Sequence, residues 1–189
     1  MKLLEEMILR EGKILPGDIL KVGSFLNQQI DTKLLSAMAE EVKNLYKETT
    51  VTKILTIESS GIAFAVAAGI AMGVPVIFAK KHQSSNVDGE IYSVPVTSYT
   101  HHNTYNAVIS KDYLTSEDHV LIVDDFLATG NALIGMIELV RQAGATLAGV
   151  AIEIEKGFQG GGDKLRAQGV RIESLALIDS MTDESITFR

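Results

Sequence analysis

Residues 120–132 read VLIVDDFLATGNA, and this stretch is the most informative part of the sequence about the fold. Its first four residues are apolar and predict a buried strand, and Asp124 and Asp125 follow at the carboxyl end of that strand. Residues 126–130 then make a short loop that opens a helix. Ligands of parallel α/β sheets bind beyond the carboxyl ends of the strands, so we expect a binding site at this point.

The residue types of this loop suit a sugar phosphate. The first turn of a helix leaves backbone N–H groups free to converge on a phosphate. The small residues Ala128 and Gly130 let the backbone come close, and the Thr129 hydroxyl adds a donor. When ionised, Asp124 and Asp125 only accept hydrogen bonds, which matches the hydroxyls of a sugar. The unit therefore predicts a ribose 5-phosphate site, and the alternative is a solvated Asp pair before an ordinary helix.

Short apolar strands alternate with helices on both sides of this stretch. Such a pattern indicates an α/β fold, in which a parallel sheet is covered by helices on both faces. Nearer the N-terminus, helical spacing predicts helices over residues 2–11 and from Asp31, as the cap, to about Tyr46. The expected strands of the sheet are residues 53–57, 74–79, 119–125, 146–154 and 170–178, and its helices begin near residues 60, 129 and 161.

Composition indicates one folded domain over residues 1–189. The chain is 46% hydrophobic and 22% charged, as in ordinary globular proteins. Its net charge of -7 disfavours nucleic acid as a partner, because such binding depends on Lys and Arg. The absence of cysteine excludes disulfides and cysteine nucleophiles and fits a reducing compartment. The N-terminal residues MKLLEEMILREGK lack the apolar run of a signal peptide, so we expect a cytoplasmic protein.

Residues 61–79 carry no charge and are long enough to suggest a membrane span. However, Gly73, Val74 and Pro75 interrupt the segment, and a proline inside a continuous helix costs about 3 kcal/mol. We therefore interpret the segment as a helix of small residues, a turn and a buried strand, and we expect no membrane association.

The segment 80–106, KKHQSSNVDGEIYSVPVTSYTHHNTYN, is polar and long for a connection inside a compact domain. Such excursions are often lids over a site, and the alternative is an exposed hairpin without a role. His101 and His102 lie within it, but no cluster of further ligands accompanies them, so we predict no metal site there.

The stretch VLIVDDFLATGNA resembles the motif with which type I phosphoribosyltransferases bind phosphoribosyl pyrophosphate (PRPP). The resemblance implies that family's fold, a parallel sheet flanked by helices with a small hood, here largely residues 1–50, and a flexible lid loop at about 80–106. It also implies that Asp124 and Asp125 bind the ribose. The residues that it assigns to the phosphate are Ala128, Thr129, Gly130, Asn131 and Ala132.

The family's pyrophosphate loop follows an earlier strand, and Glu58, Ser59 and Ser60 occupy that place here, after KILTI. Backbone N–H groups and hydroxyls in such a turn form an anion-binding concavity, although the same residues also suit a plain helix start. At the base of the excursion, Lys80, Lys81 and His82 either meet the pyrophosphate or are solvated surface charges.

Over nearly its whole length the chain resembles the branch of this family that acts on xanthine, including ILKVGSFLNQQID at 19–31 and IEIEKGFQ at 152–159. The resemblance implies that Leu20, Asn27 and Lys156 contact the base. Lys156 can only donate hydrogen bonds, which favours a 6-oxo group over the 6-amino group of adenine. The alternative for Lys156 is a surface ion pair with Glu153 or Glu155. Phe158 is expected either to stack on the base or to pack in the core.

The implied reaction converts xanthine and PRPP to xanthosine 5′-monophosphate and pyrophosphate, with Mg²⁺ bound mainly through PRPP and with a homodimer as the functional unit. Ala128 stands where hypoxanthine-guanine relatives carry a carboxylate, so the sequence names no general base. Three alternatives stay open: an enzyme for adenine or for guanine and hypoxanthine, a PRPP-sensing regulator, and a nucleotide-binding module without turnover.

Overall fold

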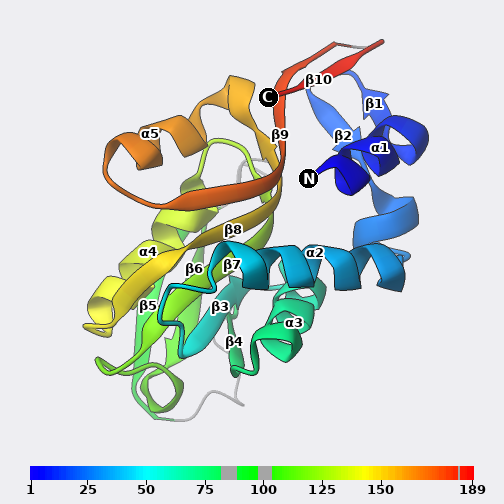
Figure 1. Cartoon of the computed structure of the whole chain (residues 1–189). Coiled ribbons are helices and arrows are strands. Elements are labelled where there is room, and N and C mark those ends of the chain that lie inside the picture. The colour runs from blue at the N-terminus through cyan, green and yellow to red at the C-terminus, as the bar shows by residue number, and fades with distance from the viewer. Residues whose placement is uncertain (82–88, 98–103, 183) are drawn as a thin grey trace.

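A computed structural model describes residues 1–81, 89–97, 104–182 and 184–189. His82, His101 and His102 lie outside the described residues, as does most of the expected loop before residue 89. Figure 1 shows the chain as a central twisted sheet with helices on either side of it.

The sheet has six strands in the order β10-β9-β8-β7-β3-β4. Its strands pair in parallel except for β10, which lies antiparallel to β9 at one edge. The predicted parallel α/β sheet is therefore confirmed, and β7 runs two residues beyond the predicted end of its strand. The strands are β3 (Lys53–Ile57), β4 (Val76–Ala79), β7 (His119–Leu127), β8 (Thr146–Lys156), β9 (Ile172–Met181) and β10 (Ile186–Phe188).

Each face of the sheet is covered by its own apolar core. Side chains alternate along β7, so Leu121 and Val123 enter one core while Val120 and Ile122 enter the other. The first core packs under α1 (Lys2–Glu11), α2 (Thr32–Leu45) and α3 (Gly61–Met72). The second packs under α4 (Asn131–Gln142), α5 (Gly161–Ala167) and the hairpin of β5 (Ile91–Thr97) and β6 (Thr104–Ser110).

The N-terminal part forms the predicted hood beside the sheet. After α1 come a small hairpin of β1 (Lys13–Leu15) and β2 (Ile19–Lys21) and one π-helical turn (Gly23–Asn27). The Asp31 carboxylate accepts from the backbone of Lys33 at 3.0 Å and of Leu34 at 3.1 Å, which confirms it as the cap of α2. Leu20 and Phe25 are buried in the first core, so the hood is packed onto the rest of the fold.

The uncharged segment 61–79 folds as predicted into a helix, a turn and a strand, but the strand is not buried as expected, because Phe78 is 42% exposed. α3 ends at Gly73, whose φ of 72° is in the left-handed region that glycine favours, and β4 begins at Val76. Within the described ranges, no helix is long and apolar enough to cross a membrane.

The excursion differs from the continuous loop that we expected over 80–106. Residues 91–97 and 104–106 belong to the β5–β6 hairpin, and Val94 and Val96 are buried in the second core. Gly135 lets the hairpin pack closely against α4, because a Cβ at this position would lie 2.5 Å from Val96 Cγ2. The alternation SVPVT is a strand signal that the polar composition of the surrounding segment obscured.

An ion pair fixes α5 to the sheet. Glu155 on β8 is fully buried, and its two oxygens accept from Arg166 Nη1 at 2.8 Å and Nη2 at 2.6 Å. At the start of α5, Gly161 donates its backbone N–H to the carbonyl of Ala128 at 3.2 Å. The loop after β7 therefore rests on α5, which is itself fixed by Arg166.

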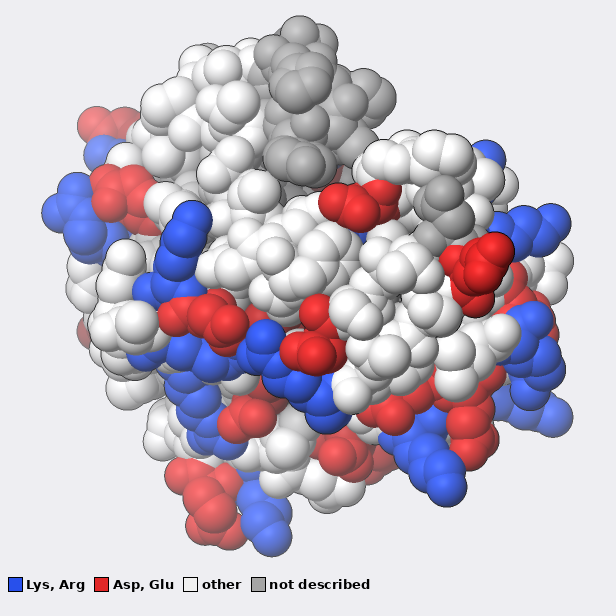
Figure 2. Space-filling model, turned by 90° about the horizontal axis from the view of Figure 1, so that it is seen from above, with Lys and Arg blue, Asp and Glu red and all other residues white. Residues whose placement is uncertain are grey.

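Charged side chains of both signs are interspersed on the surface. On the face in Figure 2, Lys and Arg lie among Asp and Glu, and no broad basic patch stands out.

We predict that Arg166→Leu lowers the free energy of unfolding by about 3 kcal/mol, because it leaves the buried Glu155 carboxylate without its partner. Urea denaturation measures this change. Arg189→Leu is the control, since its ion pair with Asp179 is exposed and should contribute less than about 1 kcal/mol. Equal effects of the two substitutions would contradict the prediction.

Candidate active site

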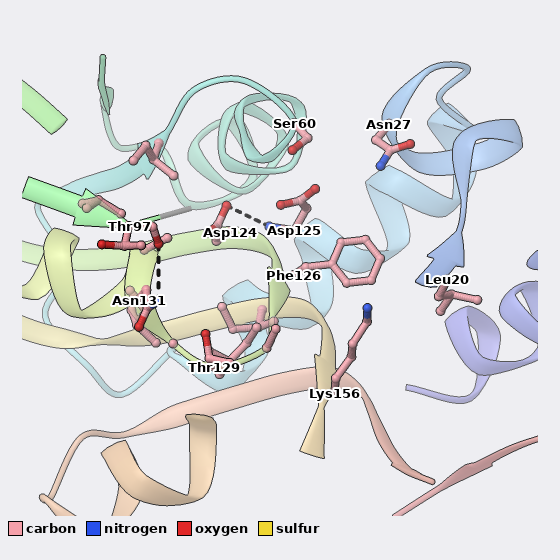
Figure 3. Close-up of a pocket in the computed structure, with 18 of the residues that line it drawn as sticks. Leu20, Asn27, Ser60, Thr97, Asp124, Asp125, Phe126, Thr129, Asn131 and Lys156 are labelled. Carbon is pink, nitrogen blue, oxygen red and sulfur yellow. Dashed lines mark hydrogen bonds between the residues drawn. The ribbon is translucent and has the colours of Figure 1, made fainter. Parts of the chain in front are cut away.

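A cavity of about 420 Å³ opens at the carboxyl ends of β3, β7 and β8. Four segments that are distant in sequence supply its walls: the hood, the turn after β3, the excursion, and the strand ends with their loops (Figure 3). The sequence-predicted residues that line it are Leu20, Asn27, Glu58, Ser60, Asp124, Asp125, Ala128, Thr129, Gly130, Asn131, Ala132 and Lys156. Ser59 is exposed and is not among the lining residues.

The loop after β7 has the geometry of an anion site. Gly130 adopts φ 89°, a left-handed conformation that favours glycine, and α4 begins at the next residue without a side-chain cap. Backbone N–H groups of the first turn of α4 are thus open to the cavity. The Asn131 side chain donates to the Thr97 carbonyl at 3.3 Å, which joins this turn to β5 (Figure 3).

Asp124 and Asp125 have different environments. Asp124 is only 6% exposed, and its Oδ1 accepts from the Asp125 backbone at 3.1 Å. Burial, and then the charge of Asp125, raise the pKa of Asp124 well above its usual range, while the charge of Lys81 acts in the opposite direction. Burial therefore disfavours the ionised form of Asp124, and the half-buried Asp125 is the more accessible acceptor.

Gly61 allows this arrangement. A Cβ at Gly61 would lie 2.6 Å from Asp124 Oδ1 and 2.7 Å from Thr56 Oγ1, so only glycine lets α3 start against the carboxylate. The Thr56 hydroxyl is buried and makes no hydrogen bond to any described residue.

The turn after β3 is tied to the base of the excursion. Glu58 Oε1 accepts from the Lys81 backbone at 2.6 Å, and a cis peptide bond joins Glu58 to Ser59. The Lys81 side chain lines the cavity with its Nζ 5.4 Å from the centre of the Tyr105 ring. Tyr105 was not predicted, and its only signal was an aromatic residue inside a polar segment.

The other end of the cavity lies between the hood and Lys156. Lys156 Nζ donates to the Asp18 carbonyl at 2.7 Å and lies 5.6 Å from the centre of the Phe126 ring. Burial lowers the pKa of Lys156. The alternative of an ion pair with Glu153 or Glu155 is wrong, because Lys156 turns toward the hood.

Phe126 is the aromatic residue of this end, and the sequence reasoning missed it. Its ring projects between Asp125 and Lys156 and faces Leu20 and Asn27 (Figure 3). Phe158, which was expected to stack or to fill the core, is 37% exposed and does not line the cavity. The available signal was the place of Phe126 within the motif, directly after the Asp pair.

Comparison with known proteins gives a consistent result. Residues 22–171 match the family model described as phosphoribosyl transferase domain. The chain is 47% identical to a xanthine phosphoribosyltransferase of Lachnoclostridium phytofermentans, covering 100% of this chain and 98% of that protein. It is 50% identical to a xanthine phosphoribosyltransferase of Bacillus cereus, covering 100% of this chain and 95% of that protein.

Solved structures support the fold. An adenine phosphoribosyltransferase from Trypanosoma brucei, in complex with AMP, pyrophosphate and ribose-5-phosphate, matches with a TM-score of 0.80 at 21% identity, covering 96% of this chain and 82% of that one. The Giardia lamblia APRTase with 9-deazaadenine matches with a TM-score of 0.79 at 23% identity, covering 92% and 96%.

We predict that Asp124→Asn raises the melting temperature of the ligand-free protein. A carboxyl whose pKa is raised by folding loses stabilising proton binding as the pH rises, from its unfolded pKa of about 4 up to its raised folded pKa. The advantage of the variant should therefore widen over this window, by about 2–4 °C for each kcal/mol gained. Differential scanning calorimetry from acid to neutral pH measures it. The exposed Asp112→Asn is the control, and a gap that does not vary with pH would refute the prediction.

Proposed function

The chain belongs to the phosphoribosyl transferase domain family, and we propose that it transfers the phosphoribosyl group of PRPP to xanthine, which gives xanthosine 5′-monophosphate and pyrophosphate. The observation that carries the proposal is one cavity lined by the start of α4, the carboxylate pair of Asp124 and Asp125, and Lys156. The full-length similarity to two xanthine phosphoribosyltransferases supports the choice of purine.

In this proposal, PRPP occupies the sheet end of the cavity. The backbone of residues 128–132 binds the 5′-phosphate at the start of α4, where N–H groups are open. Asp124 and Asp125 accept from the ribose hydroxyls. The turn at Glu58 and Ser60 and the Lys81 ammonium face the pyrophosphate, so the cation lies where the leaving group gathers charge.

The base lies between Phe126 and the hood. Lys156 exchanges its bond with the Asp18 carbonyl for one with the 6-oxo group of xanthine. Asn27 has both donor and acceptor atoms for the second oxo group or a ring nitrogen, and Leu20 covers an apolar face. Phe126 offers its ring to the other face of the purine, since offset aromatic stacking is favourable.

The reaction forms the bond from the purine nitrogen to C1′ and breaks the bond from C1′ to pyrophosphate. The displacement passes through an oxocarbenium-like state and needs no covalent nucleophile, so positioning and stabilisation of the leaving group supply the catalysis. Because Ala128 offers no carboxylate, the ring proton leaves to solvent, or xanthine binds already deprotonated and facing Lys156. In this proposal the polar excursion acts as a lid that keeps water from the bound substrates. Its described residues Lys81 and Tyr105 line the cavity.

Mg²⁺ belongs to this proposal as part of the PRPP substrate. Mg²⁺ usually keeps several waters and binds through substrate phosphates, so we expect it to arrive on the oxygens of PRPP. Within the described residues, no group of three or more His, Asp or Glu is arranged to hold a metal. When bound, it neutralises charge on the leaving pyrophosphate.

The alternatives have less support. An adenine enzyme would set an amino group against the Lys156 donor. A PRPP-sensing regulator would need a nucleic-acid surface, and the face in Figure 2 shows mixed charges. The reducing cytoplasm is the proposed compartment, in keeping with a chain that lacks cysteine.

The deciding experiment measures pyrophosphate release from PRPP with xanthine, hypoxanthine, guanine and adenine in parallel. We expect xanthine to have the highest kcat/KM and adenine to be at least about 100-fold poorer, because its amino group leaves the Lys156 donor unpaired. A preference for adenine would overturn the choice of base. The double variant Asp124→Asn with Asp125→Asn should fold and lose nearly all turnover, and normal turnover would refute the ribose contacts.

We also propose a homodimer that uses α3 and β4. α3 is uncharged around its whole circumference, yet Ile70 is 79% exposed and Val66 and Phe78 are exposed beside it. A helix that is apolar on every side is usually buried, and a second copy of this chain would cover it by two-fold symmetry.

Light scattering after size-exclusion chromatography tests this assembly. The unsubstituted protein should elute as a dimer and Ile70→Lys as a monomer, because a lysine cannot be buried there without a partner. Leu9→Lys, on the exposed side of α1, should stay dimeric. A monomeric unsubstituted protein would contradict the proposal.

A further inference from the structure

Glu153 is a buried carboxylate that the reaction described above does not use. It lies in the middle of β8, is 3% exposed, and is not among the residues that line the cavity. A carboxylate in such a place is costly unless it is paired or protonated.

The neighbour of Glu153 across the sheet is Asp125. In the parallel pairing of β7 with β8, Asp124 is opposite Ile152 and Phe126 is opposite Ile154, which sets Asp125 opposite Glu153. Side chains that are opposite in adjacent strands leave the same face of the sheet. On the other side, the pairing of β8 with β9 sets the buried, apolar Leu175 opposite Glu153.

Among the described residues, no cation is paired with Glu153 or Asp125. Arg166 is bound to Glu155, and Lys156 turns to the hood. No described residue donates a hydrogen bond to the Glu153 carboxylate, and the charges that act on it are those of Asp125 and Asp124. Burial, followed by these two charges, raises the pKa of Glu153 well above its usual range. Two adjacent carboxylates in a dry site share a proton, because they cannot both ionise cheaply.

We propose that Glu153 is a positioning residue for the ribose site, in which its protonated carboxyl donates a hydrogen bond to Asp125 and keeps that side chain directed into the cavity. The proton stays on the buried member of the pair, since Asp125 is closer to solvent. This inference rests on the proposed function, in which Asp125 accepts from a ribose hydroxyl of PRPP.

The test compares Glu153→Gln with Glu153→Leu. Glutamine keeps a neutral donor of the same length, and leucine removes the donor but fills similar space. We expect the Kd of the Gln variant for PRPP to lie within about 3-fold of that of the unsubstituted protein. The Kd of the Leu variant should be about 10-fold higher or more, because it loses one hydrogen bond to a charged group. Calorimetry with Mg²⁺-PRPP measures Kd, and kinetics should show the KM for PRPP rising while the KM for xanthine stays constant. A melting curve checks that each variant is folded. If Glu153→Leu does not fold, Glu153→Ala replaces it, because alanine also removes the donor.

A double-mutant cycle separates positioning from general packing. If Glu153 acts through Asp125, then adding Glu153→Leu to Asp125→Asn should change the Kd for PRPP by less than about 2-fold. Additive effects, an unimpaired Leu variant, or a Gln variant as weak as Leu would each overturn the inference. Failure of the proposed function is distinct, because the unsubstituted protein would then form no product with any of the four bases.

Discussion

Two acidic side chains are crowded at the carboxyl end of β7, and the elements around them have to accommodate this negative charge. Asp124 and Asp125 stand together where the sheet is nearly dry, and burial already drives Asp124 toward its neutral form. Two crowded carboxylates are unfavourable for the empty protein, and in the proposed function the hydroxyl donors of PRPP offset this cost when they bind. The neighbouring elements have to hold these groups in position without adding further charge.

Two glycines let uncharged backbone pack directly against these groups and hold them in position. Gly61 lets α3 begin against Asp124, and Gly161 lets α5 lie on the Ala128 carbonyl; at either position a Cβ would meet atoms within 2.6 Å. The position of α5 depends in turn on the buried pair of Glu155 and Arg166. The turn that we propose to bind the phosphate is therefore a loop on rigid supports, as electrostatic catalysis requires.

The other end of the cavity is formed differently, between two parts of the chain that are distant in sequence. Lys156 comes from the strand end, and the carbonyl that it meets belongs to Asp18 in the hood. In the proposed function, a purine entering between them replaces the contact of Lys156 with the Asp18 carbonyl by a contact with the substrate, so selecting an oxo group costs little desolvation. The Phe126 ring lies between Asp125 and Lys156 at this end of the cavity.

Local pattern by itself determined the alternation of strands and helices, the cap at Asp31 and the glycine turn at Gly130, because each depends on contiguous residues and on the preferences of the backbone. The same stretch predicted which strand end carries the acids and the phosphate turn. Only the tertiary structure decided that Phe126 rather than Phe158 enters the cavity and that Asp125 lies opposite Glu153. It also decided that Lys156 meets a carbonyl 138 residues away. Those contacts follow from strand order, register and the packing of the hood, which join residues far apart in the chain and leave no periodic trace in the sequence.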